Sequence, residues 1–291
     1  APYTSLTQAK HLRSPAQKIV ANEVVLEDGN KLPFDYAIVS TGSFTKGAPF
    51  IKGHETHSID DRLKELAARS GQLADSKNLL IVGGGPIGVE LAGEVADRYL
   101  NKKITLAHAS DRLLPALPPK AGHKAAKKLR ELGVHVLLNT RVEEKNGKYL
   151  VQGSNESFGA DVVIMAIGIQ TKGIPVDGDA SLNDKNQLRV DQHLRVVGRE
   201  NVFAVGDVND VAEIKLAATG GRQAALAVKN IGKLLRGKGG SLGSYKPSPP
   251  MGFVTLGRKA GIAQLPFGRL DVLVAIKQKD MMVSRTLGGG R

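Results

Sequence analysis

A glycine fingerprint between a short apolar run and a helical pattern constrains this chain more than its other features. The segment Ile81–Ala92 reads I-V-G-G-G-P-I-G-V-E-L-A and places Gly83, Gly85 and Gly88 in G-x-G-x-x-G spacing. The first glycine permits a tight turn, the second lets a pyrophosphate approach the backbone, and the third lets a helix pack on its strand. The segment therefore predicts a dinucleotide-binding turn.

The flanking sequence supports this prediction, because a G-x-G-x-x-G alone also occurs in structural turns. Asn78–Val82 predicts a buried strand, Pro86–Leu100 an amphipathic helix, and Lys103–Ala107 the next strand. Together they form a βαβ unit of about 30 residues.

The end of the second strand departs from the pattern of NAD-binding proteins, in which an acidic residue binds the ribose 2′-hydroxyl. His108 occupies that position, and Arg112 follows in the loop. The carboxylate that would repel a 2′-phosphate is missing, and Arg112 could accept one, so NADH, NADPH or both remain candidates. For His108 the alternative is a loop histidine without a ligand role.

Composition excludes several classes of function. At 291 residues and 41% hydrophobic content, the chain is long enough for two domains with cores. It has no cysteine, which excludes disulfides, thiolate metal sites and a redox-active dithiol within these residues. The closest histidine pair, His54 and His57, has no neighbouring ligands in sequence, so no metal site is expected. No apolar run reaches the ~18 residues of a transmembrane helix.

The net charge of +13 raises the question of nucleic-acid binding. Its densest patch, Lys120–Arg130, predicts an amphipathic helix whose lysines face solvent. Because only 4% of residues are aromatic and no nucleic-acid-binding module is visible, nucleic acid is not an expected partner.

Further along the chain, two similar strands flank the nucleotide-binding unit. Phe34–Ser40 runs into Thr41-Gly42-Ser43, and Ala160–Gly168 again ends in a small residue and a glycine. Lys18–Leu32 predicts a hairpin before them, and Ser58–Arg69 a helix between them. This arrangement indicates an inserted domain that the chain enters and leaves once.

A third strand ends in a second chemical signal. Asn201–Val208 closes with Gly206-Asp207, which puts a carboxylate at the strand end where open α/β sheets bind ligands. The predicted helix Lys215–Leu235 follows, and its N-terminal amides suit an anion or an electron-rich ring. A purely structural turn is the alternative.

In their order along the chain, these motifs resemble the two-dinucleotide-binding-domain flavoprotein reductases. Within that superfamily the chain is similar to apoptosis-inducing-factor-like proteins of the ferroptosis-suppressor type and to type II NADH dehydrogenases. The similarity extends over most of the chain from about Lys18. It is carried by Thr41-Gly42, Ile81–Ala92, Thr105–His108, Ala166-x-Gly168, Leu188–Val196, Asn201–Val208, Leu256–Gly261 and Lys279–Ser284.

The resemblance implies an α/β protein with two Rossmann-like, three-layer ββα dinucleotide-binding domains. It assigns residues 1–52 and 169–246 to an FAD-binding domain, 53–168 to an NAD(P)-binding domain and 247–291 to a small C-terminal segment. The family's first G-x-G-x-x-G, which holds the FAD pyrophosphate, is absent from this sequence. The FAD-binding domain is therefore expected to be truncated.

The resemblance also implies an FAD-dependent oxidoreductase that passes a hydride from NAD(P)H through flavin to a quinone-type acceptor, without a catalytic acid or nucleophile from the protein. Ferredoxin or monodehydroascorbate as acceptor, and a truncated module that binds NAD(P)H without turnover, are the alternatives. Asp207 is assigned to the flavin ribityl chain and Glu90 to the nicotinamide. The residues expected at FAD are Thr41, Gly42, Ser43, Gly206, Asp207, Lys215, Leu216 and Ala217. Those expected at NAD(P)H are Gly83, Gly85, Pro86, Gly88, Glu90, His108, Arg112 and Gly168.

The segment Leu265–Lys277 combines apolar residues with flanking basic ones. It predicts a short strand of the C-terminal segment, and a peripheral membrane contact is the alternative. The expected location is the cytoplasm or the cytoplasmic face of a membrane, with an organelle also compatible.

Overall fold

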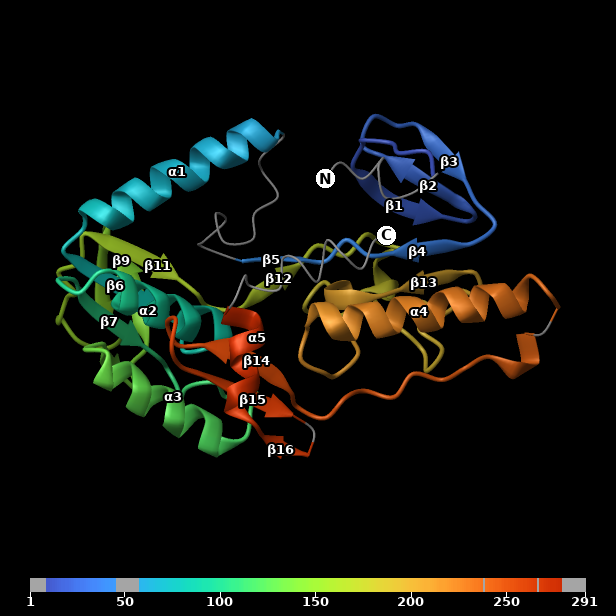
Figure 1. The fold of residues 1–291 in the computed structure, drawn as a ribbon. Helices are drawn as coiled ribbons and strands as arrows, with labels where there is room; N and C mark the ends of the chain where they lie inside the picture. Colours follow the sequence, from blue (N-terminus) through green and yellow to red (C-terminus); the bar gives the residue numbers. More distant parts are fainter. Residues whose placement is uncertain (1–8, 46–57, 238, 266, 279–291) are drawn as a thin grey trace. The chain divides into compact units, whose positions relative to one another are not determined.

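The structure is a computed structural model that describes residues 9–45, 58–237, 239–265 and 267–278 (Figure 1). It has the mixed α/β architecture predicted from the sequence, with parallel strand pairing in both parts of the chain. The chain divides into two compact units. The first consists of Ala1–Ser43, Gln170–Ser248 and Gly288–Arg291, and the second of Phe44–Ile169 and Pro249–Leu287.

A four-stranded parallel sheet forms the centre of the second unit, in the order β11, β6, β7, β8. The predicted bounds of the two strands around the fingerprint are confirmed. After its first residue Asn78–Val82 is a continuous apolar run, which is typical of a strand that is covered on both faces, whereas in Lys103–Ala107 the buried Ile104 and Leu106 alternate with polar residues. The strands are β6 (Asn78–Val82), β7 (Lys103–Ala107), β8 (His135–Leu137) and β11 (Val162–Met165).

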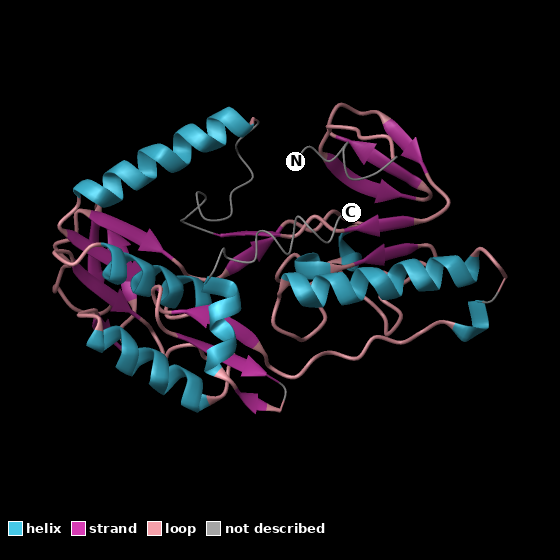
Figure 2. Cartoon of the chain, in the orientation of Figure 1, coloured by secondary structure: helices cyan, strands magenta, loops and turns pink. Residues whose placement is uncertain are grey.

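Successive side chains of β6 point to opposite faces of this sheet. Leu80 and Val82 pack with Tyr149 and Phe158, next to an antiparallel hairpin. Two helices contact the sheet and each other, and Figure 2 shows them beside the strands. The hairpin strands are β9 (Val142–Lys145) and β10 (Lys148–Val151), and the helices are α2 (Pro86–Arg98) and α3 (Pro119–Glu131).

The helix α1 (Ile59–Asp75) confirms the predicted helix and extends beyond its predicted end. Ser58 caps it, because its Oγ accepts a hydrogen bond from the Asp61 amide at 3.1 Å. Asp60 and Asp61 lie in the first turn, where negative charge is favourable. No residue of α1 is buried.

The C-terminal part of the second unit packs on α2. A Cβ atom on Gly93 of α2 would lie 2.8 Å from the Leu256 Cα, so this helix position has no room for a side chain. The segment consists of the antiparallel strands β14 (Gly252–Thr255), β15 (Gly261–Leu265) and β16 (Gly268–Arg269), followed by the helix α5 (Val274–Gln278).

The predicted strand over Leu265–Lys277 is wrong. Among its described residues, Leu265 ends β15 and Gly268–Arg269 form β16, while Asp271–Leu273 is a 3₁₀ turn that continues into α5. Val274 is 1% exposed because it packs against Gly261, whereas Val272 is 71% exposed. Asp271 fixes the turn by accepting a hydrogen bond from the Ala263 amide at 3.1 Å.

Several sequence predictions fall outside the described residues. They are the histidine pair His54 and His57, the domain boundary at residues 52 and 53, and the segment Lys279–Ser284. Among the residues that the structure describes, no helix is both long and apolar enough to cross a bilayer.

The first unit begins with a three-stranded antiparallel meander, which confirms the predicted hairpin within Lys18–Leu32. Ile19, from its first strand, is buried in the core of this unit. The strands are β1 (Ala16–Val20), β2 (Glu23–Leu26) and β3 (Lys31–Pro33).

A pair of parallel strands lies at the centre of the first unit. Val202 and Ala204 pack with Val39 on one face, while Phe203 packs with Ala227 of the long helix on the other. The predicted strand Phe34–Ser40 is shorter in the structure, and the predicted helix begins two residues later. The elements are β4 (Ala37–Val39), β13 (Val202–Ala204) and α4 (Ala217–Leu234). The strands β5 (Ser43–Thr45) and β12 (Ile169–Thr171), which pair with each other, contain two of the points at which the chain passes from one unit to the other.

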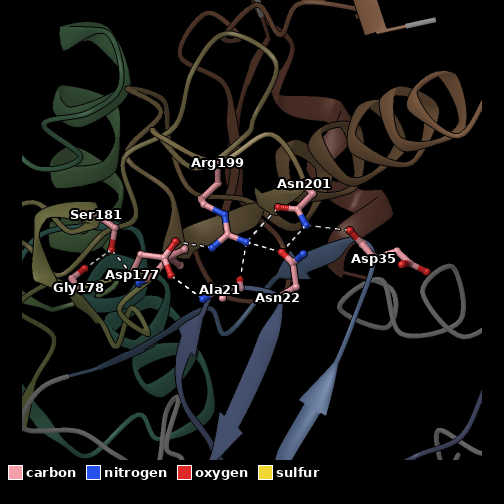
Figure 3. Close-up of polar contacts among 9 residues, drawn as sticks. Ala21, Asn22, Asp35, Asp177, Gly178, Ser181, Arg199 and Asn201 are labelled. Carbon is pink, nitrogen blue, oxygen red and sulfur yellow. Dashed lines mark hydrogen bonds and ion pairs between the residues drawn. The ribbon is translucent and has the colours of Figure 1, made fainter. Parts of the chain in front are cut away.

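Arg199 joins the turn between β1 and β2 to the segment before β13 (Figure 3). Its Nη2 donates to the Ala21 carbonyl at 2.5 Å and to Asn22 Oδ1 at 2.9 Å, and its Nη1 pairs with Asp177. Asp177 in turn accepts from the Ala21 amide at 2.7 Å. Both peptide groups of Ala21 are thus bound by side chains far away in sequence, which stabilises its left-handed backbone (φ 49°).

Candidate functional site

The fingerprint glycines of the second unit occupy a turn that other residues would disrupt. Gly83 has φ 117°, and a Cβ on it would collide with the Ala166 carbonyl oxygen. A Cβ on Gly88 would collide with the carbonyl oxygen of Gly83. These contacts agree with the roles predicted for the first and third glycines, a tight turn and close packing of α2.

Gly85 differs from its neighbours because a Cβ on it would meet no atom within 4 Å. It is the N-cap of α2, with φ −74°, and Pro86 occupies the first helical turn. Pro86 has no amide hydrogen that would need a partner there. The open side of Gly85 therefore lies at a helix N-terminus that follows the carboxyl end of β6, a favourable position for an anion.

His108 lies at the end of β7, and its ring contacts the fingerprint turn. Its Nδ1 accepts a hydrogen bond from the Gly84 amide at 3.1 Å. Its Nε2 is buried and has no partner within hydrogen-bond distance in the described part of the chain. Burial lowers the pKa of His108, while the Arg112 backbone and the Asp111 charge oppose this shift more weakly. The ring is therefore neutral at pH 7.

Arg112 holds the loop that follows β7. Its Nη1 donates to the Leu117 carbonyl at 2.8 Å and its Nη2 to the Pro115 carbonyl at 2.9 Å. The Arg112 guanidinium, which the sequence offered as a binder of a 2′-phosphate, thus holds the loop between β7 and α3.

Glu90, predicted near the nicotinamide, is held by the C-terminal segment of the same unit. Its Oε1 accepts from the Thr255 amide at 3.0 Å and pairs with Lys277 Nζ. Lys277 also donates to the Phe253 carbonyl at 3.0 Å. The sequence analysis did not identify Lys277. Its spacing of three residues from the buried Val274 is a signal that it lies on the packed side of α5.

Gly168 follows β11, which pairs in parallel with β6, so it lies at the same sheet edge as the fingerprint. Its φ of 85° is a left-handed conformation that favours glycine. The second unit thus brings Gly83, Gly85, Pro86, Gly88, His108 and Gly168 to the carboxyl ends of neighbouring parallel strands.

In the first unit, the residues predicted at FAD follow the carboxyl ends of β4 and β13, which are neighbours in parallel pairing. Ser43 Oγ donates to Asp207 Oδ2 at 2.5 Å, which joins the two chain segments. Gly42 and Gly206 both have positive φ, at 71° and 79°. Thr41 donates to the Lys172 carbonyl at 3.3 Å.

The start of α4 lies close to the same strand end. Gln223 of α4 accepts from the Gly206 amide at 2.7 Å and donates to Glu213 at 2.7 Å. Leu216 is the N-cap, and its amide donates to Thr219 Oγ1 at 3.1 Å. Ala217 is the first residue of α4, where amides lack partners within the helix. Gln223 was not predicted, because its role depends on the tertiary position of α4.

Lys215 has a structural side chain. Its Nζ donates to Asn209 O at 2.8 Å, Asn209 Oδ1 at 3.1 Å and the Val211 carbonyl at 3.0 Å. Burial lowers the pKa of Lys215, and nearby acidic residues, Glu213 foremost, oppose the shift. The Lys215 ammonium group holds the loop after β13. Only the backbone of Lys215 is therefore still a candidate for contact with the cofactor.

Within the described residues, no three His, Cys, Asp or Glu side chains gather into a group that could hold a metal ion.

Comparison with known proteins agrees with this geometry. The chain is 32% identical over 292 residues to Apoptosis-inducing factor homolog B of Dictyostelium discoideum, covering 91% of this chain and 75% of that protein. It is 31% identical over 277 residues to human Ferroptosis suppressor protein 1, covering 90% of this chain and 73% of that protein.

Among solved structures, the NAD-Dependent Persulfide Reductase from A. fulgidus has the same fold, with a TM-score of 0.66 and 19% identity. The superposition covers 91% of this chain and 50% of that structure. The sequence profile of the pyridine nucleotide-disulphide oxidoreductases matches residues 3–228. The chain therefore belongs to the pyridine nucleotide-disulphide oxidoreductase family, with apoptosis-inducing factor homologs and ferroptosis suppressor protein 1 as distant homologues.

Proposed function

We propose that this chain is an FAD-dependent oxidoreductase that transfers a hydride from NAD(P)H through flavin to a quinone-type acceptor. The observation that carries the proposal is the fingerprint turn, where two glycines have no room for a side chain and the glycine between them is open at a helix N-terminus. Membership of the family supports the pairing of a nicotinamide cofactor with a flavin.

The residues of the second unit fit a dinucleotide. Gly85 leaves space for a pyrophosphate beside the first amides of α2, which carry partial positive charge. Glu90, one turn into α2, is fixed by the Thr255 amide and Lys277. In the proposal, Gly83, Gly85 and Gly88 hold the phosphates, and Glu90 and Gly168 lie toward the nicotinamide.

The residues of the first unit fit part of a flavin site. Asp207 and two left-handed glycines follow neighbouring parallel strands, the edge at which open α/β sheets bind ligands. In the proposal, Asp207 holds the ribityl chain, Thr41, Gly42 and Ser43 line the cofactor, and the backbone at Leu216 and Ala217 faces its ring. When bound, NAD(P)H supplies the hydride and FAD accepts it.

The absence of cysteine bears on the acceptor. The 291 residues contain no thiol, so they supply no dithiol that could receive electrons from a flavin. A small diffusible acceptor, such as a quinone, is consistent with that composition. Ferredoxin and monodehydroascorbate are other acceptors that the same chemistry allows.

A second candidate function is NAD(P)H binding without turnover. The observation that favours it is the difference between the two units, because only the second carries a G-x-G-x-x-G in this sequence. Flavin retention distinguishes the two functions.

The test is NADH oxidation by the purified chain with added FAD and a short-chain ubiquinone, compared with Gly85→Val. Gly85 has φ −74° and open surroundings, so the fold tolerates valine while the phosphate position is filled. We expect quinone-dependent oxidation that the substitution reduces at least tenfold, with an unchanged unfolding midpoint. NADH binding without oxidation would instead support the binding module.

A further inference from the structure

The peptide groups of Gly84, the second residue of the fingerprint, are held on both sides. Its amide donates to His108 Nδ1 at 3.1 Å, and its carbonyl accepts from the Leu114 amide at 2.8 Å. Gly84 lies between the tight turn at Gly83 and the open position at Gly85. The orientation of its peptide groups therefore sets where the following amides point.

The His108 ring also packs directly on this residue. A Cβ on Gly84 would lie 2.7 Å from His108 Cγ, and it would collide with the Leu113 side chain. Leu113 and Leu114 are completely buried, and Leu114 has φ 52°, a strained value for leucine. The loop after β7 is thus pressed against the fingerprint turn with little freedom to adjust.

The hydrogen bond from Gly84 fixes the protonation state of the ring. A nitrogen that accepts from an amide carries a lone pair, so Nδ1 has no proton and Nε2 carries it. A second proton can bind only at Nδ1, and it would replace the Gly84 hydrogen bond with two donors facing each other. The neutral ring is the form that holds the turn.

The surroundings of His108 offer limited compensation for a charged ring. Asp111 and the Arg112 backbone, both on the following loop, favour the charged form. The fingerprint turn contacts His108 through backbone groups, which do not titrate. The segment Leu137–Thr140 forms hydrogen bonds with the His108 backbone and contains no titratable side chain.

We propose that His108 is a positioning residue for the dinucleotide: its neutral ring holds the Gly84 peptide in the orientation that binds the cofactor, and protonation of the ring releases the turn and weakens binding. This inference rests on the proposed function, in which the fingerprint turn binds NAD(P)H. It assigns His108 a role on the turn itself, in place of the contact with the ribose that its position in the motif suggests.

The experiment measures the Kd of NADH by its fluorescence between pH 5.5 and 8, using freshly mixed samples of the whole chain. His108→Asn places an amide oxygen, which accepts hydrogen bonds and does not titrate, near the position of Nδ1. His108→Leu removes the acceptor. We expect the wild-type Kd to rise as the pH falls through the pKa of His108, which burial holds below the ordinary value of 6.5, while His108→Asn keeps a nearly constant Kd close to the wild-type value at pH 8. We expect His108→Leu to bind roughly 5- to 50-fold more weakly at every pH, the cost of one unsatisfied amide.

Two results would overturn the inference: parallel pH profiles for the wild type and His108→Asn, or wild-type affinity in His108→Leu. If His108→Leu does not fold, the comparison of the wild type with His108→Asn decides alone. Failure of the wild type to bind NADH at any pH would contradict the proposed function itself. Binding that Gly85→Val does not weaken would also place the ligand elsewhere.

Discussion

Glu90 and Lys277 form an ion pair between side chains 187 positions apart in sequence, and it joins α2 to α5 within the second unit. Both side chains are about four-fifths buried, at 20% and 19% exposure. The pair therefore holds the predicted nicotinamide-side carboxylate in one position and anchors the C-terminal segment on the helix that carries the fingerprint.

Replacement of Lys277 tests this anchoring. Lys277→Met should lower the free energy of unfolding by roughly 1 to 3 kcal/mol, because it leaves the Glu90 carboxylate partly buried without its cation. The measurement is urea denaturation, with Lys128→Met as the control, since Lys128 pairs on the surface with Glu131. The double variant Lys277→Met, Glu90→Gln should lose less unfolding free energy than the sum of the losses in the two single variants. Strict additivity would show that the two residues do not interact.

Gly93 provides a second test of the same packing. Gly93→Ala should destabilise the chain by about 1 to 3 kcal/mol, because the added Cβ would lie 2.8 Å from the Leu256 Cα and 3.0 Å from the Gly257 nitrogen. Gly71→Ala is the matched control in α1, where a Cβ meets no atom within 4 Å. That change should stabilise the helix by about 0.5 to 1 kcal/mol. Equal effects of the two substitutions in urea denaturation would argue against close packing at Gly93.

The Arg199 cluster of the first unit predicts a pH dependence of stability. Burial alone would raise the pKa of Asp177, but the Ala21 amide and Arg199 outweigh it and lower the pKa below the ordinary value of 3.8. Because the folded state binds this proton less readily than the unfolded state, the contribution is present above pH 3.8 and is lost as the pH falls through the lower folded value. The stability difference between the wild type and Asp177→Asn should therefore shrink in that acidic range. A constant difference between pH 7 and 3 would contradict the assignment.

The residue at the end of β7 predicts the cofactor preference. Since His108 is neutral and replaces the carboxylate of NAD-specific sites, NADH and NADPH should bind with affinities within about tenfold of each other. His108→Glu introduces a charge that repels a 2′-phosphate, and it should reduce NADPH affinity more than NADH affinity. Fluorescence titration with both cofactors measures the ratio. A wild-type preference far above tenfold for either cofactor would indicate that another residue distinguishes the 2′-hydroxyl of NADH from the 2′-phosphate of NADPH.

The features that were predicted best from the sequence are those that depend on a local sequence pattern. The bounds of β6 and β7 and the start of α2 at Pro86 are confirmed, because an apolar strand, a glycine turn and a proline at the first helical turn are local signals. The predicted strand over Leu265–Lys277 failed because a distant glycine, Gly261, makes the space that Val274 fills.

Contacts made by distant segments could not be predicted. The spacing of Lys277 from Val274 indicates only which side of α5 it lies on; its pairing with Glu90 depends on how the C-terminal strands pack against α2. For His108 the sequence left a ligand role and a plain loop histidine open. The hydrogen bond from the Gly84 amide to His108 forms because β6 and β7 are neighbours in the sheet, and the sequence alone does not show that contact.

The decisive measurement is the visible absorption spectrum of the purified chain after incubation with FAD and removal of free cofactor, recorded anaerobically before and after NADH is added. The proposed function predicts flavin bands that remain with the protein and lose intensity with NADH, and a much slower loss in Gly85→Val. A chain that binds NADH but retains no flavin, or whose flavin bands do not respond to NADH, would contradict it.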